Sequence, residues 1–177
     1  HRRARPAGGN ERGARQGGLS GESTGAIYVK NTPSSASPAP SVYVDLNTIF
    51  GAGTTGANPH PVATTVWADA DPANVDPNTI TVVGKRGLGD LEISKDGANL
   101  YSVSFNDRRL YVIPTSGTLN STTITRFDIP TTGLATSNGN CNSADVRPFG
   151  LGRDPSGNMY VGAVCSAESE SDNSKVH

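Results

Sequence analysis

The sequence predicts an all-β protein built from four-stranded antiparallel sheets, with essentially no helix. Short runs of alternating apolar and polar residues recur along the chain, and turn-forming residues separate them. No segment shows the 3.6-residue apolar period of an amphipathic helix. The chain contains 21 glycines and 12 prolines among 177 residues, and only 18% of its residues are charged. This composition favours a turn-rich β protein over a helical bundle.

Composition also excludes several functional classes. A net charge of −1 argues against a dedicated nucleic-acid-binding protein. The chain has no stretch of about 18 apolar residues, so we expect no membrane-spanning helix. Hydrophobic residues make up 34% of the chain, which leaves few side chains for an independent core.

The first 25 residues predict an arm rather than part of a core. They contain five arginines and two glutamates, and Leu19 is their only large apolar residue. An arginine-rich arm can bind an acidic partner, and a solvated linker is the alternative.

Residues 26–49 predict a hairpin, and residues 50–84 an insertion. Two β runs, at 26–29 and 41–46, flank a loop rich in serine and proline at 31–40. Residues 50–84 show little periodicity, and a structureless stretch of this length is often functional.

The clearest block, residues 85–130, predicts a complete four-stranded antiparallel unit. An Asp-Gly signal at 96–97 marks its first turn, and an Asn-Asp pair at 106–107 marks its second. Residues 131–170 predict one further hairpin, and residues 171–177 a tail. The four predicted strands of the block are 90–93, 99–103, 109–113 and 122–129.

Internal repeats connect these elements. A shift of 83 residues aligns the hairpin at 26–46 with the one at 109–129, bringing Tyr28 onto Tyr111 and Asp45 onto Asp128. At a shift of 63, the sequence GLG at 87–89 meets GLG at 150–152, and at a shift of 59, NLY at 99–101 meets NMY at 158–160.

Four-stranded sheets repeated in tandem predict the blades of a β-propeller, in which each blade packs on its neighbours. In this interpretation the chain is a partial propeller, and further blades or subunits of the same protein stabilise it. Its parts are an outer hairpin of a first blade at 26–49, an inter-blade insertion at 50–84, a complete blade at 85–130 and the inner strands of the next blade at 131–170.

The phrases GDLEISKDGANLYSVSFNDRRLYVI and RPFGLGRDPSGNMYVGAVC resemble the repeats of YVTN- and NHL-type β-propellers. The order of motifs over about 23–170 is similar to the propeller region of large secreted or cell-surface bacterial proteins that also carry adhesin modules. The resemblance implies an extracellular or cell-surface location and supplies no catalytic motif.

In the secreted setting that the resemblance implies, Cys141 and Cys165 favour a disulfide, because they flank one hairpin-sized segment. Two free thiols are the alternative. The sequence contains no CxxC motif and no paired histidines, which argues against a zinc site.

The insertion holds three further candidate features. His60 lies between two prolines, where a loop anchor is the alternative to a ligand-binding role. Trp67 suits carbohydrate stacking, or packs the insertion against a blade. A cluster of acidic and amide side chains could bind calcium, which takes oxygen ligands and is the one cofactor that the sequence suggests. A solvated acidic loop is the alternative. The cluster consists of Asp69, Asp71, Asn74 and Asp76.

Asp90 and Glu92 lie two positions apart on one predicted strand and therefore share a face. In a propeller the innermost strand lines the channel, where such a pair resembles the metal site of regucalcin-like lactonases. A polar seam between blades is the alternative. Arg86 and Arg147 lie near strand entries and either bind an anionic ligand or pair with aspartates. Asn120 begins an N-glycosylation sequon in a predicted loop.

These observations predict a non-catalytic structural or adhesive propeller module of a larger extracellular or filament-forming protein. Its blade-edge loops, chiefly those of residues 50–84, would bind a carbohydrate or another cell-surface partner. The alternative is a fragment of a propeller hydrolase, a calcium-assisted lactonase or esterase that uses Asp90 and Glu92.

Overall fold

The computed structural model describes residues 23–30, 40–58, 82–133, 135–136 and 139–169. Strands dominate these ranges, and the helical segments are five and three residues long, as the all-β prediction requires. The elements are β1 (Ala26–Val29), β2 (Ser41–Asp45), α1 (Leu46–Phe50), β3 (Leu88–Ile93), β4 (Asn99–Ser104), β5 (Arg109–Pro114), β6 (Thr125–Asp128), β7 (Ala135–Thr136), β8 (Gly139–Asn140), η2 (Ser143–Asp145), β9 (Val146–Arg153) and β10 (Met159–Cys165).

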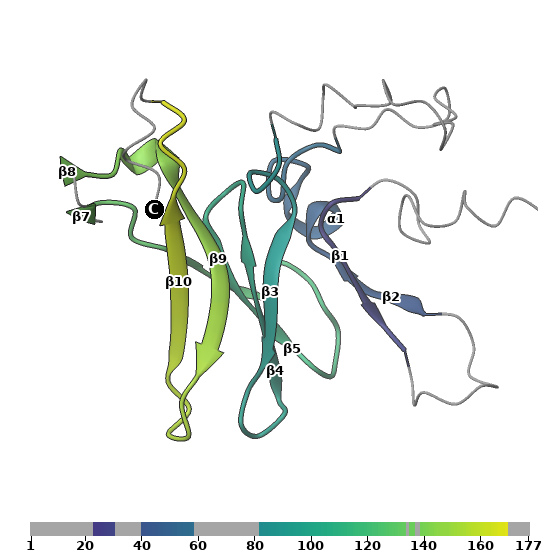
Figure 1. Cartoon of the computed structure of the whole chain (residues 1–177). Helices are drawn as coiled ribbons and strands as arrows, with labels where there is room; N and C mark the ends of the chain where they lie inside the picture. Colours follow the sequence, from purple (N-terminus) through teal and green to yellow (C-terminus); the bar gives the residue numbers. More distant parts are fainter. Residues whose placement is uncertain (1–22, 31–39, 59–81, 134, 137–138, 170–177) are drawn as a thin grey trace, which may run out of the picture.

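A four-stranded antiparallel sheet, β3-β4-β5-β6, forms the centre of the molecule (Figure 1). It confirms the four-stranded unit expected within 85–130. Its first turn follows the Asp-Gly signal, because the Asp96 carboxylate accepts the Ala98 N–H at 3.0 Å and Gly97 adopts a φ of 72°. The hydrogen bond from the Ser94 hydroxyl, reinforced by the Ala98 N–H, lowers the pKa of Asp96.

The last strand of this sheet is shorter than predicted. The strand expected at 122–129 begins only at Thr125, because the Asn120 side chain accepts the N–H groups of Thr122 and Thr123 at 2.8 and 3.0 Å. These bonds hold residues 120–123 in a turn. The turn brings Ile124, which is buried, into the main apolar cluster.

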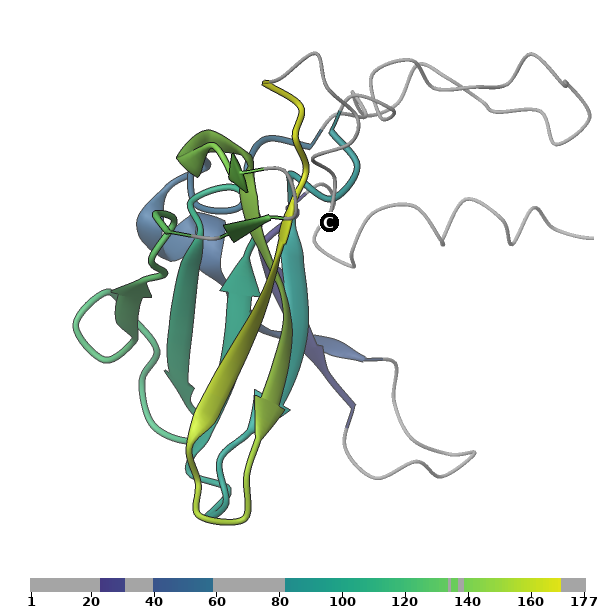
Figure 2. The same cartoon turned by 60° about the vertical axis from the view of Figure 1, so that its left-hand side comes forward.

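Two-stranded hairpins pack against both faces of the central sheet (Figures 1 and 2). Paired residues of an antiparallel sheet point to the same face. One face carries Tyr111 and Ile113, which form a buried cluster with Ile27 and Val44 of the β1–β2 hairpin. On the other face, β9 of the β9–β10 hairpin packs against β3 and β4.

A glycine allows the close contact between β9 and the central sheet. A Cβ atom on Gly89 would lie 2.7 Å from the Phe149 carbonyl oxygen and 2.7 Å from the Val103 side chain. The rings of Phe105 and Phe149 stack beside this point with centroids 5.3 Å apart. The β3 backbone therefore approaches β9 more closely than any residue with a side chain allows.

The register of the first hairpin recurs in the central sheet. Ala26 pairs with Asp45 and Ile27 with Val44, and 83 positions later Arg109 pairs with Asp128 and Leu110 with Phe127. The alignment of 26–46 with 109–129 in the sequence is therefore also an alignment of backbone pairing, up to a β-bulge after Ile27.

The register of the last hairpin corrects the predicted shift of 63. Glu92 pairs with Tyr101 in the central sheet, and Gly152 pairs with Tyr160 in the β9–β10 hairpin. The first strands therefore correspond at a shift of 60, and the second strands at the predicted 59. The alignment of 87–89 with 150–152 matched similar letters, but the strand pairing does not follow them. The bulges of β3 and β9 are equivalent, because three residue steps, from Leu88 to Leu91 and from Pro148 to Leu151, each lie opposite two steps of the partner strand. The two hairpins differ in the turn, which is one residue shorter between Arg153 and Met159 than between Ile93 and Leu100.

One segment of the predicted first hairpin is helical instead of extended. The Asp45 carboxylate accepts the N–H groups of Asn47 and Thr48 at 2.9 and 3.4 Å, which caps α1 and ends the strand expected to reach residue 46. Leu46 is fully buried at the start of this helix. The short elements β7, β8 and η2 were likewise not predicted. No helix in the described ranges has the length and apolar character needed to cross a bilayer.

Candidate functional site

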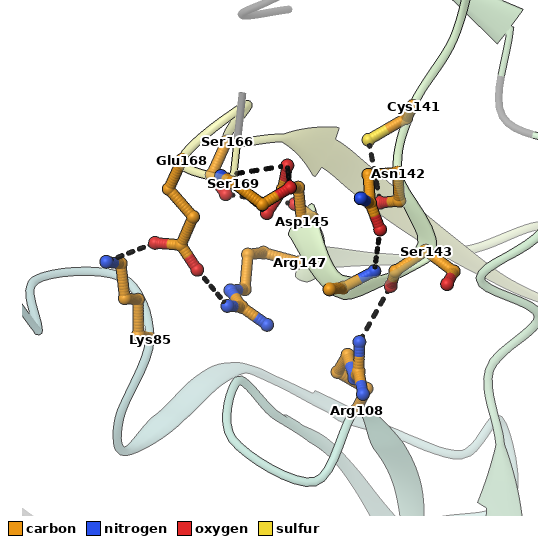
Figure 3. A network of polar contacts seen from close by, with 11 residues as sticks. Lys85, Arg108, Cys141, Asn142, Ser143, Asp145, Arg147, Ser166, Glu168 and Ser169 are labelled. Atoms are coloured by element: carbon orange, nitrogen blue, oxygen red, sulfur yellow. Dashed lines mark hydrogen bonds and ion pairs between the residues drawn. The ribbon is translucent and has the colours of Figure 1, made fainter. Parts of the chain in front are cut away.

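A polar network lies at one end of the sheets, where residues 141–147 meet the segment 166–169 after β10 (Figure 3). We call residues 166–169 the strap. The network joins the strap to η2, to the beginning of β9 and to the loop that precedes β3. Three of the predicted site residues, Cys141, Arg147 and Cys165, lie at this end.

The two cysteines form the predicted disulfide, with Cα atoms 5.9 Å apart. Cys141 follows β8 and Cys165 ends β10, so the bond closes the β9–β10 hairpin at its open end. Both cysteines are buried and pack with Val146 and Ala167 in a second apolar cluster. The disulfide therefore belongs to the packed interior of this end of the molecule.

Asp145, at the end of η2, fastens the strap. Its side chain is nearly fully buried and accepts the Ser169 N–H at 3.2 Å and the Ser169 hydroxyl at 2.6 Å. Its main-chain carbonyl accepts the Ser166 N–H at 2.9 Å. A buried carboxylate requires such donors, since an unpaired charge in the interior is costly. Asp145 thus plays a structural part that the sequence analysis did not assign to it.

Glu168 of the strap bridges two cations from different sheets. One carboxylate oxygen accepts from Arg147 of β9 at 2.5 Å, and the other pairs with Lys85 in the loop before β3. Burial raises the pKa of Glu168, but the hydrogen bonds and charges of Lys85 and Arg147 outweigh it and leave the pKa below its usual value of 4.5. The bridge ties the strap to the central sheet.

The predicted arginines are engaged within the chain. Arg147 was expected to bind an anion or pair with an aspartate, and it pairs with Glu168 instead. Arg86 donates to the Ala57 carbonyl at 3.0 Å and packs over Gly56, where a Cβ would lie 2.8 Å from its side chain. A third arginine, Arg108, donates to the Ser143 carbonyl at 2.7 Å. These cations hold loops of neighbouring sheets together.

Asp90 and Glu92 do not converge on a common point. Asp90 accepts the Leu151 N–H from β9 at 3.1 Å and the Leu91 N–H at 2.9 Å. Glu92 accepts the Ile93 N–H at 3.1 Å. No group of three or more histidine, cysteine, aspartate or glutamate side chains that could hold a metal occurs within the described residues. Asp90 acts here as a hydrogen-bonding link between β3 and β9.

The remaining candidates fall into two groups. Asn120 lies in the loop between β5 and β6, as predicted, and its side-chain oxygen accepts the hydroxyl of Thr122, the third residue of the sequon, at 2.7 Å. The others lie in the stretch 59–81, outside the described residues. These are His60, Trp67, Asp69, Asp71, Asn74 and Asp76.

The contacts that Asp145, Glu168 and Ser169 make in the structure were not predicted from the sequence. One signal was present, since Asn142 begins a capped turn in which its side chain accepts the Ala144 N–H at 3.0 Å. The contacts of the strap join residues more than 20 positions apart and leave no local pattern. No family model, curated protein or solved structure matches this chain.

Proposed function

We propose that this chain is a non-catalytic structural module of an extracellular or cell-surface protein, built from parts of three propeller blades and binding through loops at the sheet ends. One observation carries the proposal: hairpins pack against both faces of the four-stranded sheet, and their pairing registers recur within that same sheet. Repeated units that bury each other's faces are the basis of propeller stability.

The chemistry at the sheet ends supports a structural role. The Arg147–Glu168–Lys85 bridge, the Asp145 anchor and Arg86 all hold chain segments together. Such bonds fix loop positions, and rigid loops on a stable scaffold suit recognition of a partner. The disulfide is compatible with an oxidising, extracellular setting. We propose a carbohydrate or cell-surface partner for these loops and for residues 50–84.

Binding and turnover assays on one protein preparation test the proposal. The chain would be screened against arrays of cell-surface glycans and against lactone and ester substrates, with and without calcium. We expect saturable glycan or cell-surface binding that is lost when residues 59–81 are replaced by a Gly/Ser linker, and no hydrolysis. The matched control replaces residues 31–39, which lie outside the proposed binding segment.

Two results would overturn the proposal. One is saturable hydrolysis that disappears in both Asp90→Asn and Glu92→Gln, which would establish the lactonase or esterase alternative. The other is the absence of binding to any glycan or cell surface by a chain that is folded by circular dichroism.

A further inference from the structure

The chain carries two incomplete sheets that complement each other. The β1–β2 hairpin has the register of β5–β6, and the β9–β10 hairpin corresponds to β3–β4. In the central sheet these two kinds of hairpin are joined, because β4 pairs with β5. Within the described residues, β10 pairs only with β9 and β1 only with β2. The edge of β10 and the edge of β1 therefore correspond to the two sides of the β4–β5 ladder.

The exposure of equivalent residues shows that, among the described residues, the β6 side of the central sheet is left uncovered beside β10. Val44 of the first hairpin is 5% exposed, because the central sheet covers it, whereas its equivalent Phe127 on β6 is 53% exposed. The difference arises because β9 contacts β3 and β4, the other half of the same sheet. A hairpin seated beside β10 would cover Phe127, as the central sheet covers Val44.

The edges of β1 and β10, which are unpaired within the described residues, also carry exposed apolar side chains at matching positions. Tyr101 pairs with Val112 across the β4–β5 ladder. The equivalent of Tyr101 on β10 is Tyr160, which is 57% exposed, and the equivalent of Val112 on β1 is Val29, which is 39% exposed. Exposed strand edges with apolar side chains are templates for the addition of another strand.

The hairpin that fits cannot come from the same copy in this structure. The β1–β2 and β9–β10 hairpins lie on opposite faces of the central sheet (Figures 1 and 2). We propose that the β1–β2 hairpin of a second copy of this chain adds to the free edge of β10, forming the sheet β9-β10-β1-β2 across the two copies. The inference rests on the proposed stacking of repeated units and is independent of ligand binding by the loops.

The proposed contact is head-to-tail, because each copy offers β10 at one side and β1 at the other. Such heterologous contacts generate rings when the rotation closes and open filaments when it does not. Tyr28 of the incoming hairpin is equivalent to Tyr111 of the central sheet. In the proposed contact it would therefore pack over Leu110 and Phe127. The central sheet already shows this packing, where Tyr111 lies in the cluster with Ile27 and Val44.

A cross-linking experiment tests the register. Val29→Cys and Tyr160→Cys chains are prepared separately, mixed and oxidised under conditions that preserve the Cys141–Cys165 bond. We expect mixed disulfide-linked pairs containing one copy of each variant. The control replaces Val164, which is 41% exposed and lies four residues farther along β10, about 13 Å from the paired position. Cross-linking that is as efficient with Val164→Cys, or that joins only like variants, contradicts the head-to-tail pairing.

Sedimentation of the unmodified chain over a concentration series tests the association itself. We expect assembly to grow with concentration and to weaken about tenfold or more in Phe127→Asp, which loses the apolar surface to be covered. Val83→Asp is the matched control, because Val83 is 69% exposed and lies outside the proposed contact. A chain that stays monomeric at every concentration overturns the inference. Glycan binding by that monomer would support the proposed function and refute only the proposed assembly. Assembly without glycan binding would support the proposed assembly and refute the proposed function.

Discussion

At the scale of single residues, the strap is held by charges that are partly shielded from water. The side chains of Arg147, Glu168 and Lys85 are 14%, 28% and 34% exposed. Isolated surface ion pairs contribute little, but a carboxylate shared by two cations in a partly buried site contributes more than an exposed pair. The hydrogen bond between Tyr111 and Asp107 is a second contact whose contribution to stability depends on burial.

The contribution of Glu168 to stability should decrease as the pH is lowered. Its pKa is lowered in the folded state, so its contribution is complete above the usual value of 4.5 and is lost as the pH falls below that value through the folded pKa. We expect Glu168→Gln to cost about 0.5–1 kcal/mol at pH 7 and to cost less as the pH falls below 4.5 toward 3. Urea unfolding across this pH range measures the difference.

The control for this measurement is Glu92→Gln, which removes a carboxylate whose described hydrogen bond is to the neighbouring Ile93 N–H. At pH 7 it should destabilise the chain less than Glu168→Gln, because it breaks no contact between distant segments. If Glu168→Gln destabilises the chain equally at pH 3 and pH 7, the ion bridge is not the source of its contribution.

Removal of the Tyr111 hydroxyl should destabilise the folded chain. The side chain is fully buried, and its hydroxyl donates to Asp107, whose other carboxylate oxygen is buried without a protein partner. We expect Tyr111→Phe to cost about 1–3 kcal/mol in urea unfolding, because the Asp107 carboxylate loses its donor. Tyr160→Phe is the control, since that hydroxyl is exposed and bonds to Asp154 at 3.2 Å, and we expect it to cost less than about 0.5 kcal/mol.

Burial raises the pKa of Tyr111 above its usual value of 10, and the hydrogen bond to Asp107 raises it further. The folded state therefore keeps the phenolic proton while the unfolded chain releases it. Stability should fall as the pH rises above 10 in the unmodified chain. That loss should be smaller in Tyr111→Phe, and an identical alkaline profile for the two proteins would contradict this assignment.

At the scale of elements, the approach of β9 to β3 depends on the absence of one side chain. A Cβ on Gly89 would lie 2.7 Å from a main-chain oxygen of Phe149, which cannot move without moving β9. We expect Gly89→Ala to destabilise the chain by about 1–3 kcal/mol in denaturant unfolding. Gly152→Ala provides the matched control, because Gly152 also lies in a strand and a Cβ there meets no atom within 4 Å.

The outcome at these two glycines separates close packing from strand propensity. Alanine favours a strand slightly over glycine on entropic grounds, so Gly152→Ala should be neutral or mildly stabilising. Equal destabilisation by the two substitutions would mean that the close contact between β3 and β9 does not limit packing.

Local signals in the sequence predicted much of the element structure. The Asp96-Gly97 turn, the central sheet and the first hairpin follow from alternation and turn chemistry within a few residues. The helix α1 escaped prediction, because Asp45 was interpreted only as a strand residue although it caps the next five residues. The shift of 63 also failed, since it matched similar letters, whereas the strand pairing shows two turns that differ in length by only one residue.

The candidate site was less predictable than the fold. The Cys141–Cys165 bond was predicted because the two cysteines flank one hairpin-sized segment in a chain that resembles secreted proteins. The partner of Arg147 was not, because Glu168 lies 21 positions away and is brought near only when the strap folds back. Contacts between distant segments depend on packing, which a single sequence does not display.

At the scale of the whole molecule, stability comes from faces that cover each other. The largest apolar cluster draws its side chains from β1, β2, α1, β5 and the turn before β6, so it forms only when the hairpin docks on the sheet. The second cluster is smaller and contains both cysteines. The β9–β10 end of the molecule therefore relies on a covalent bond where the apolar core is small.

The disulfide should accordingly stabilise the molecule as a whole. Cys141 and Cys165 are 24 residues apart, and closing a loop of this length restricts the unfolded chain by about 3 kcal/mol. We expect the Cys141→Ser, Cys165→Ser double variant to unfold at lower denaturant concentration by that amount. The strap should loosen as well, because Ser166 and Ser169 follow Cys165 directly and depend on its position to reach Asp145. Hydrogen exchange at the Ser169 amide measures that second effect.

Reduction of the unmodified chain supplies the control, since it removes the bond without changing either side chain beyond the added hydrogen. The reductant should shift the unmodified chain to the stability of the double variant and leave the double variant unchanged. If the Ser169 amide stays protected after reduction, Asp145 and Glu168 hold the strap without the disulfide. If the unfolding midpoint also stays unchanged, packing of Val146 and Ala167 alone maintains this end of the molecule.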